Sequence, residues 1–168
     1  MLLALGIPVA GWCADGDTFT VTTTEGLAMT MMVLSETDKT CQVGDGERNC
    51  IEQAYTGSVT IPQTANGYAV TAIGSYAFYN YYHYGSGDLN VTSVNIPEGV
   101  TAINRYAFDD QRELKTIELP STLRQIDEYA FNGSGLTAIT LPEGMTSIGA
   151  SAFYNDRLLT GVTLPSEA

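Results

Sequence analysis

The sequence predicts a β-rich repeat solenoid that follows a small N-terminal cap. A short phrase recurs along the chain, and in each copy an alternating apolar run ends at a proline. The prolines Pro97, Pro120, Pro142 and Pro165 follow one another at steps of 23, 22 and 23 residues. A fixed period of this length is typical of a solenoid, in which each unit buries its apolar edge against its neighbours.

The copy at residues 114–131 shows what one unit contains. Apolar and polar residues alternate from Ile117 to Leu119, as in a strand with one buried face. Pro120 ends the strand because it has no N–H to donate. The return half is too short for a helix, so we expect a short strand or a 3₁₀-type turn. Two buried columns should result, made of Phe78, Phe108, Phe131 and Phe153, and of Ile73, Ile103, Ile126 and Ile148.

The first copy, from Val59 to Phe78, carries two insertions. Residues 63–69 lengthen its turn and contain Asn66-Gly67, a favoured type I′ hairpin dipeptide. Residues 80–88 lengthen the connection to the second copy. Insertions in solenoids go to surface loops, so we expect both to leave the stack intact.

The strand Leu-x-x-Ile-x-Leu-Pro, the Ile-Gly or Ile-Asp step and the closing Tyr-Ala-Phe resemble the BspA-like (Treponema-type) bacterial leucine-rich repeat family. The resemblance covers roughly Gly57 to Pro165, in four full copies and one partial copy. It implies a leucine-rich-repeat-like right-handed stack of 23-residue units with an N-terminal β-hairpin cap. The chain departs from the family in lacking the cysteine that often follows the phenylalanine, so we expect no cysteine ladder.

We divide the chain into an apolar leader (1–14), a β cap (15–56) and the repeat solenoid (57–168). The leader is uncharged, ends in small residues and looks like the second half of a signal peptide cleaved near Ala14. The alternative is a short buried strand, since the segment is too short to span a membrane. Cys13 is a weak candidate for lipidation, because Trp12 stands where a small residue is required. We therefore predict a secreted or cell-surface bacterial protein whose mature chain does not insert into a membrane.

The cap should be rich in strands. Residues 18–24 and 28–34 are β-branched or apolar runs, and residues 40–43 and 49–54 are expected to pair as a hairpin around Asp45-Gly46. Cys41 and Cys50 flank this turn, and in an exported protein they favour a disulfide. Two free thiols and half of a metal site remain as alternatives, although the one histidine, His83, is distant in sequence.

The net charge of the chain and its lack of known motifs limit the classes of function that we expect. Seven Lys and Arg stand against 19 Asp and Glu, a formal net charge of −12, which disfavours nucleic acid and anionic membranes as partners. We find no catalytic, phosphate-binding or metal-binding motif, and therefore expect no enzyme, no cofactor and no metal. The acidic pairs Asp109-Asp110 and Asp127-Glu128 fall in repeat turns, where solvated charges explain them better than a glycosidase pair.

Two surfaces remain as candidates for binding. The first is the outward side of the repeat strands, with the columns Ser58, Ser93, Thr116, Ala138, Gly161 and Thr60, Asn95, Glu118, Thr140, Thr163. These small polar residues fit a recognition face, but they also simply favour exposed strands. The second is the aromatic insertion with Tyr79, Tyr81, Tyr82, His83 and Tyr84, which either contacts a partner or packs down on the neighbouring repeat.

The function we predict is a non-catalytic binding module that mediates adhesion to a protein or glycan on a host or neighbouring cell. Adhesive bacterial surface proteins are what the family resemblance implies. A structural spacer in a larger surface protein is the alternative, and a hydrolase is a third. The sequence stops inside a repeat at Ala168, which predicts a fragment or an exposed edge open to edge-to-edge dimerisation.

Overall fold

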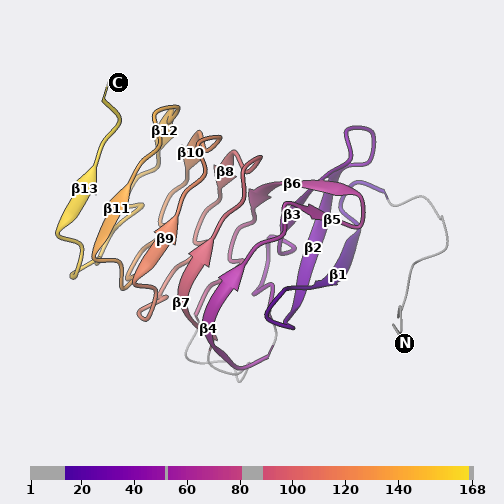
Figure 1. Cartoon of the computed structure of the whole chain (residues 1–168), viewed down its shortest axis with the longest axis horizontal. Coiled ribbons are helices and arrows are strands. Elements are labelled where there is room, and N and C mark those ends of the chain that lie inside the picture. The colour runs from indigo at the N-terminus through magenta and orange to yellow at the C-terminus, as the bar shows by residue number, and fades with distance from the viewer. Residues whose placement is uncertain (1–13, 52, 81–88, 167–168) are drawn as a thin grey trace.

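The computed structural model describes residues 14–51, 53–80 and 89–166. It is an elongated stack of strands, with the cap at one end and the last repeat at the other (Figure 1). No helix occurs among these residues, so none there is long and apolar enough to cross a membrane. The predicted solenoid is confirmed.

The cap consists of three strands that join the solenoid through a shared sheet. Strand β1 (Thr18–Thr22) pairs antiparallel with β2 (Ala28–Ser35), and β2 pairs antiparallel with β3 (Thr40–Val43). The other edge of β3 pairs in parallel with β6 (Tyr68–Ile73), the return strand of the first repeat. One buried core runs from Leu27 in the cap to Ala152 in the last full repeat, so no break in the packing separates the two regions.

The hairpin predicted for residues 40–54 is wrong. Residues 40–43 form β3, but both edges of β3 are occupied by β2 and β6, which leaves no place for a returning strand. The following segment instead folds back as a loop, in which the Cys50 N–H donates to the Ala77 carbonyl at 2.7 Å. The Thr30 N–H donates in turn to the Cys50 carbonyl at 2.8 Å. Loop contacts of this kind satisfy the backbone without a ladder.

Each repeat has a front strand and a short return strand. The front strands are β4 (Tyr55–Thr60), β7 (Leu89–Asn95), β9 (Thr116–Glu118), β11 (Ala138–Thr140) and β13 (Gly161–Thr163). The return strands that follow β6 are β8 (Ala102–Ile103), β10 (Gln125–Ile126) and β12 (Ser147–Ile148), all parallel and in register. The return half is therefore a strand, one of the two forms expected.

The first insertion forms the predicted hairpin. Strand β5 (Thr64–Ala65) pairs antiparallel with β6, and Asn66 and Gly67 connect them with φ angles of 50° and 85°. Two positive φ angles in succession are the geometry of a type I′ turn. The second insertion lies mostly outside the described residues, but the strands on either side of it, β4 and β7, pair in parallel from end to end.

The aromatic ladder is confirmed. The rings of Phe78, Phe108, Phe131 and Phe153 stack nearly parallel, with successive centroids 5.0, 5.2 and 5.4 Å apart. The first three are fully buried, whereas Phe153 is only partly covered. The isoleucine column is buried through Ile126, but Ile148 is 46% exposed, contrary to the prediction. Ile148 lies on β12, the last strand of the eight-stranded sheet, so no further strand covers it.

Candidate functional site

The predicted front columns lie side by side. Ser58 faces Ser93 and Ser93 faces Thr116 across β4, β7 and β9, and the Ser93 hydroxyl donates to the Ser58 hydroxyl at 2.9 Å. The second column follows the same register, with Thr60, Asn95 and Glu118 on these strands and Thr140 beside Thr163 on β11 and β13. The predicted columns therefore follow the strand register within each of these two groups of strands.

The front face is interrupted between β9 and β11. In the described part of the chain, the front strands form one sheet of β4, β7 and β9 and a second of β11 and β13, with no ladder between β9 and β11. A hollow of about 770 Å³ lies over this break. Its apolar lining comes from both strands and their ends: Ile117, Leu119, Ile139 and Leu141. Equal repeats predict an unbroken sheet, so this break could not be foreseen from the period alone.

Acidic side chains surround this front hollow. Glu98, Glu118 and Glu143 line it, against the single cation Lys115. Glu98 accepts hydrogen bonds from the Ser121 N–H at 2.9 Å and the Ser121 hydroxyl at 3.0 Å. The bond from the Ser121 N–H is the main reason why the pKa of Glu98 lies below its ordinary value. Glu143 accepts equivalent bonds from Ser166, one repeat further on. Hydrogen bonds from the following repeat therefore fix both carboxylates in place.

A second aromatic column lines the turns that close each repeat. The rings of Tyr76, Tyr106 and Tyr129 stack with successive centroids 5.2 Å apart, and each of these residues has a positive φ near 58°. The Arg105 guanidinium lies 4.7 Å from the centre of the Tyr106 ring. Sequence reasoning gave these tyrosines no role, although their period of 23 residues between Tyr106 and Tyr129 is visible.

The aromatic insertion can be placed only in part. Tyr79 is partly buried and its ring packs edge-on against Tyr76, with centroids 5.7 Å apart. Tyr76 belongs to the same repeat as Tyr79, so packing of the insertion on the neighbouring repeat stays a prediction. Tyr81, Tyr82, His83 and Tyr84 lie outside the described residues.

One buried glutamine fixes both ends of this insertion. The Gln111 side chain is fully buried, and its amide donates to the carbonyls of Phe78 at 2.6 Å and Leu89 at 2.9 Å. Its oxygen accepts from the Val91 N–H at 2.9 Å. The repeat pattern does not indicate this role for Gln111. The equivalent positions of the next two repeats hold Ser134 and Asp156, so no glutamine recurs with the period.

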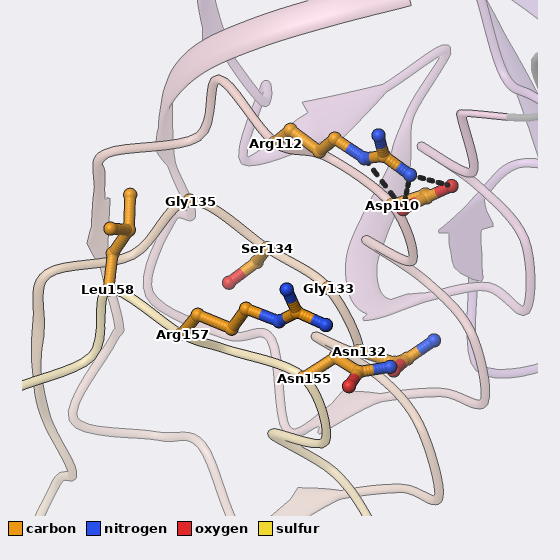
Figure 2. Close-up of a pocket in the computed structure, with 9 residues that line it drawn as sticks. All are labelled: Asp110, Arg112, Asn132, Gly133, Ser134, Gly135, Asn155, Arg157 and Leu158. Carbon is orange, nitrogen blue, oxygen red and sulfur yellow. Dashed lines mark hydrogen bonds and ion pairs between the residues drawn. The ribbon is translucent and has the colours of Figure 1, made fainter.

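A polar notch occupies the loops that precede the front strands. It has a volume of about 450 Å³, and Figure 2 shows Arg157 crossing it near Ser134 and Asn155, with Arg112 at its far side. The Arg112 guanidinium is paired with Asp110, with N···O distances of 3.0–3.3 Å. The sequence analysis did not assign this notch.

Two aspartates lie in the loops that form the notch, Asp109 buried and Asp156 partly buried. Burial raises the pKa of the Asp109 carboxyl to about 6, and the same cause raises the pKa of Asp156 to about 6. Asp109 accepts from the Asn132 side-chain amide at 2.7 Å, and Asp156 accepts from the Ser134 N–H at 2.6 Å. Each side chain therefore joins neighbouring repeats, and its raised pKa means that it takes up a proton at a higher pH than an exposed aspartate does.

Cys41 and Cys50 are both buried and are free thiols in the structure. Burial raises the pKa of Cys41 to about 11 and raises that of Cys50 still further. Such thiols are poor nucleophiles because little thiolate is present at neutral pH. The structure thus has the free-thiol alternative rather than the disulfide.

Among the described residues, no group of three or more His, Cys, Asp or Glu side chains is close enough to hold a metal ion. The two acidic pairs stand in or beside turns, with Glu128 paired to Arg105 at 3.2 Å. Asp109 is buried, so the prediction of solvated charges is wrong for this residue. The absence of catalytic activity and of a cofactor stays a prediction from the sequence.

The sequence of the repeat region shows which family the chain belongs to. The sequence model of the BspA type leucine rich repeat region (6 copies) matches residues 71–168, more than half of the chain. The chain belongs to the BspA type leucine-rich repeat family. No curated protein matches the sequence of this chain.

Solved structures show the same fold. The pneumococcal vaccine antigen PcpA is 27% identical, with a TM-score of 0.70 over 89% of this chain and 39% of that one. A leucine-rich repeat protein from Bacteroides capillosus is 26% identical, with a TM-score of 0.67 over 88% and 97% of the two chains. Another from Bacteroides ovatus is 29% identical, with a TM-score of 0.59 over 87% and 32%. This BspA type repeat protein therefore spans well under half the length of two of its structural relatives.

Proposed function

We propose that this BspA type repeat protein is a non-catalytic binding module, displayed outside the bacterial cell, that attaches to proteins through its front strands. The front hollow between β9 and β11 is the observation that supports the proposal most. It combines an apolar floor with three carboxylates and lies within a flat polar face of the kind that repeat proteins use for partners. Similarity to a pneumococcal vaccine antigen supports a location outside the cell.

The chemistry of the front hollow indicates its partner. Ile139 and Leu141 are almost fully buried, whereas Ile117 and Leu119 are partly exposed in the floor of the hollow. Glu118 is exposed on the outer face of β9. A partner segment with an apolar side chain for the floor and Lys or Arg beside it would satisfy both features. The net charge of −12 adds a longer-range attraction for a basic partner.

A peptide selection tests this proposal. Heptapeptides selected from a random phage-displayed library on the wild-type protein should be rich in Lys or Arg next to apolar residues. Ala138→Trp, which fills the front hollow, and Glu118→Lys, which reverses its charge, should each weaken these peptides at least about tenfold. Glu47→Lys and Ala150→Trp place the same changes at exposed positions elsewhere and should leave affinity unchanged. Equal loss with the control variants, or no selected peptide, contradicts the proposal.

A structural spacer within a larger protein is the second candidate. Two of the structural relatives are much longer than this chain, which supports a role for these repeats as one part of an assembly. Under this reading the front-face variants change neither peptide binding nor cell attachment, while core variants change stability alone.

A further inference from the structure

The polar notch in the loops arises where one repeat is a residue shorter than its neighbours. From the ladder phenylalanine to the next leucine that packs in or against the core there are six residues in the second copy (Phe108 to Leu114) and six in the fourth (Phe153 to Leu159). In the third copy, from Phe131 to Leu136, there are only five. The loop of the third copy therefore lacks a side chain that the loops on both sides possess.

Arginine stands at the corresponding position of both flanking loops. Arg112 and Arg157 each follow the ladder phenylalanine by four residues, and the shortened loop between them reads Asn132-Gly133-Ser134-Gly135. The two arginines are two repeats apart, about 10 Å along the stack at a spacing of about 4.8 Å per strand. Figure 2 shows the Arg157 side chain extending across a floor made of glycine and serine, while the Arg112 side chain at the far wall turns toward Asp110.

Backbone contacts hold the short loop of residues 132–135 close against the loops of both neighbouring repeats. A Cβ atom at Gly135 would lie 2.0 Å from the Arg112 carbonyl oxygen, so only glycine permits this close approach. The Gly135 N–H donates to the Gln111 carbonyl at 3.1 Å, and the Gly133 N–H donates to the Tyr154 carbonyl at 2.7 Å. The notch is thus built into the packing of neighbouring repeats.

The two walls differ in their electrostatics. The Arg112 guanidinium is neutralised by Asp110, whereas no residue in the described part of the chain forms a hydrogen bond or ion pair with the Arg157 guanidinium. A single unpaired cation over a polar floor is unusual in a chain with seven Lys and Arg and 19 Asp and Glu. A ligand carboxylate is a group that this guanidinium can bind through two parallel N–H···O bonds.

The other residues that line the notch could contact parts of a ligand beyond its anionic group. Asn155 and Ser134 offer an amide and a hydroxyl beside Arg157, and Leu158, which is 52% exposed, adds an apolar surface. Amides match the hydroxyl groups of a sugar, and an aliphatic side chain matches the C–H face of its ring. The volume of about 450 Å³ lies within the range of roughly 300–1,000 Å³ found for small-ligand sites.

We propose that this loop notch binds a carboxylated sugar, with the sugar carboxylate on Arg157 and its hydroxyl groups on Asn155 and Ser134. The inference adds a glycan ligand to the proposed binding module, and it uses none of the residues that line the front hollow. A free phosphate would use Arg157 alone and would gain nothing from Leu158 or the amide.

Nuclear magnetic resonance titration of the ¹⁵N-labelled full chain tests the notch. Methyl β-D-glucuronide is the probe, methyl β-D-glucoside is its uncharged match, and inorganic phosphate is the anion without a ring. We expect the glucuronide to shift the amide signals of Gly133, Ser134 and Gly135 and the Arg157 Nε–H signal. Arg157→Gln should weaken glucuronide binding at least about tenfold, since it removes a charge-assisted pair. Arg48→Gln, which removes the same charge from the cap, should leave binding unchanged.

A second variant tests the notch without removing an arginine. One serine inserted after Ser134 restores the six-residue spacing and should abolish glucuronide binding while the phenylalanine ladder still folds. Equal shifts with glucoside or phosphate, no shift with glucuronide, or unchanged binding in Arg157→Gln would each overturn the proposal. Ala138→Trp should bind glucuronide normally, so failure of the loop notch and failure of the front hollow are distinguishable.

Discussion

Gln111 offers a sharp test of how the stack tolerates its long insertion. Replacing Gln111 with leucine keeps the apolar volume but removes three hydrogen bonds, to the carbonyls of Phe78 and Leu89 and from the Val91 N–H. All three backbone groups belong to the segments that enter and leave the insertion. Gln111 itself is fully buried, so water does not replace the lost partner.

The expected cost follows from these three groups. A buried polar group that loses its partner costs about 1–3 kcal/mol, so the loss of three partners in Gln111→Leu should lower the free energy of unfolding by about 3–9 kcal/mol. In a chain of this size each kcal/mol corresponds to about 2–4 °C, which predicts a fall in Tm of roughly 6–36 °C. Gln53→Leu changes an exposed glutamine in the same way and should alter stability by no more than about 0.5 kcal/mol.

Urea unfolding followed by circular dichroism measures the difference, with differential scanning calorimetry for Tm. Repeat proteins can unfold in parts, so the two methods must agree before a single free energy is quoted. A loss below about 1 kcal/mol for Gln111→Leu would show that the three backbone groups find other partners, and the reasoning would then be refuted.

Two further predictions concern titration and thiols. Because burial holds the pKa of Asp109 and Asp156 at about 6, above the value of about 3.9 for an exposed aspartate, the folded chain binds more protons between these values and stability falls as pH rises through them. Tm should therefore be higher at pH about 5 than at pH about 7, and Asp156→Asn should reduce the difference; an unchanged difference contradicts this. In a Cys13→Ser variant, Cys41 and Cys50 should resist alkylation in the native protein and both react after denaturation; a mass lower by two hydrogens would instead reveal a disulfide.

Most of the fold could be predicted from the regular spacing of the apolar residues. Phe108 and Phe131 recur with the strand pattern around them, and each can be buried only by stacking on its neighbour, so the ladder followed directly from their spacing. Asn66-Gly67 likewise fixed the first hairpin, because few other dipeptides accept two positive φ angles. These are local or nearest-neighbour effects, which a single sequence records.

What the sequence did not reveal depends on contacts between segments. The hairpin expected at residues 40–54 failed because β6 takes the free edge of β3, a pairing that joins residues 30 positions apart. Ile148 follows the buried pattern, yet its position on the last strand of its sheet leaves it exposed. The polar notch was present in the sequence as a step of 22 between steps of 23, but its chemistry became visible only when the flanking loops were placed beside it.

The parallel pairing of β3 with β6 favours folding that starts at the cap and proceeds toward the last repeat. The three cap strands present a preformed edge onto which the first return strand adds, and each later return strand then finds a template only about one repeat away in sequence. Contacts of such short sequence separation close small loops and keep the entropic cost of each addition low. Assembly that proceeds outward from the cap therefore needs no contact between distant parts of the chain, and substitutions far from the cap should fray the stack without dissolving its base.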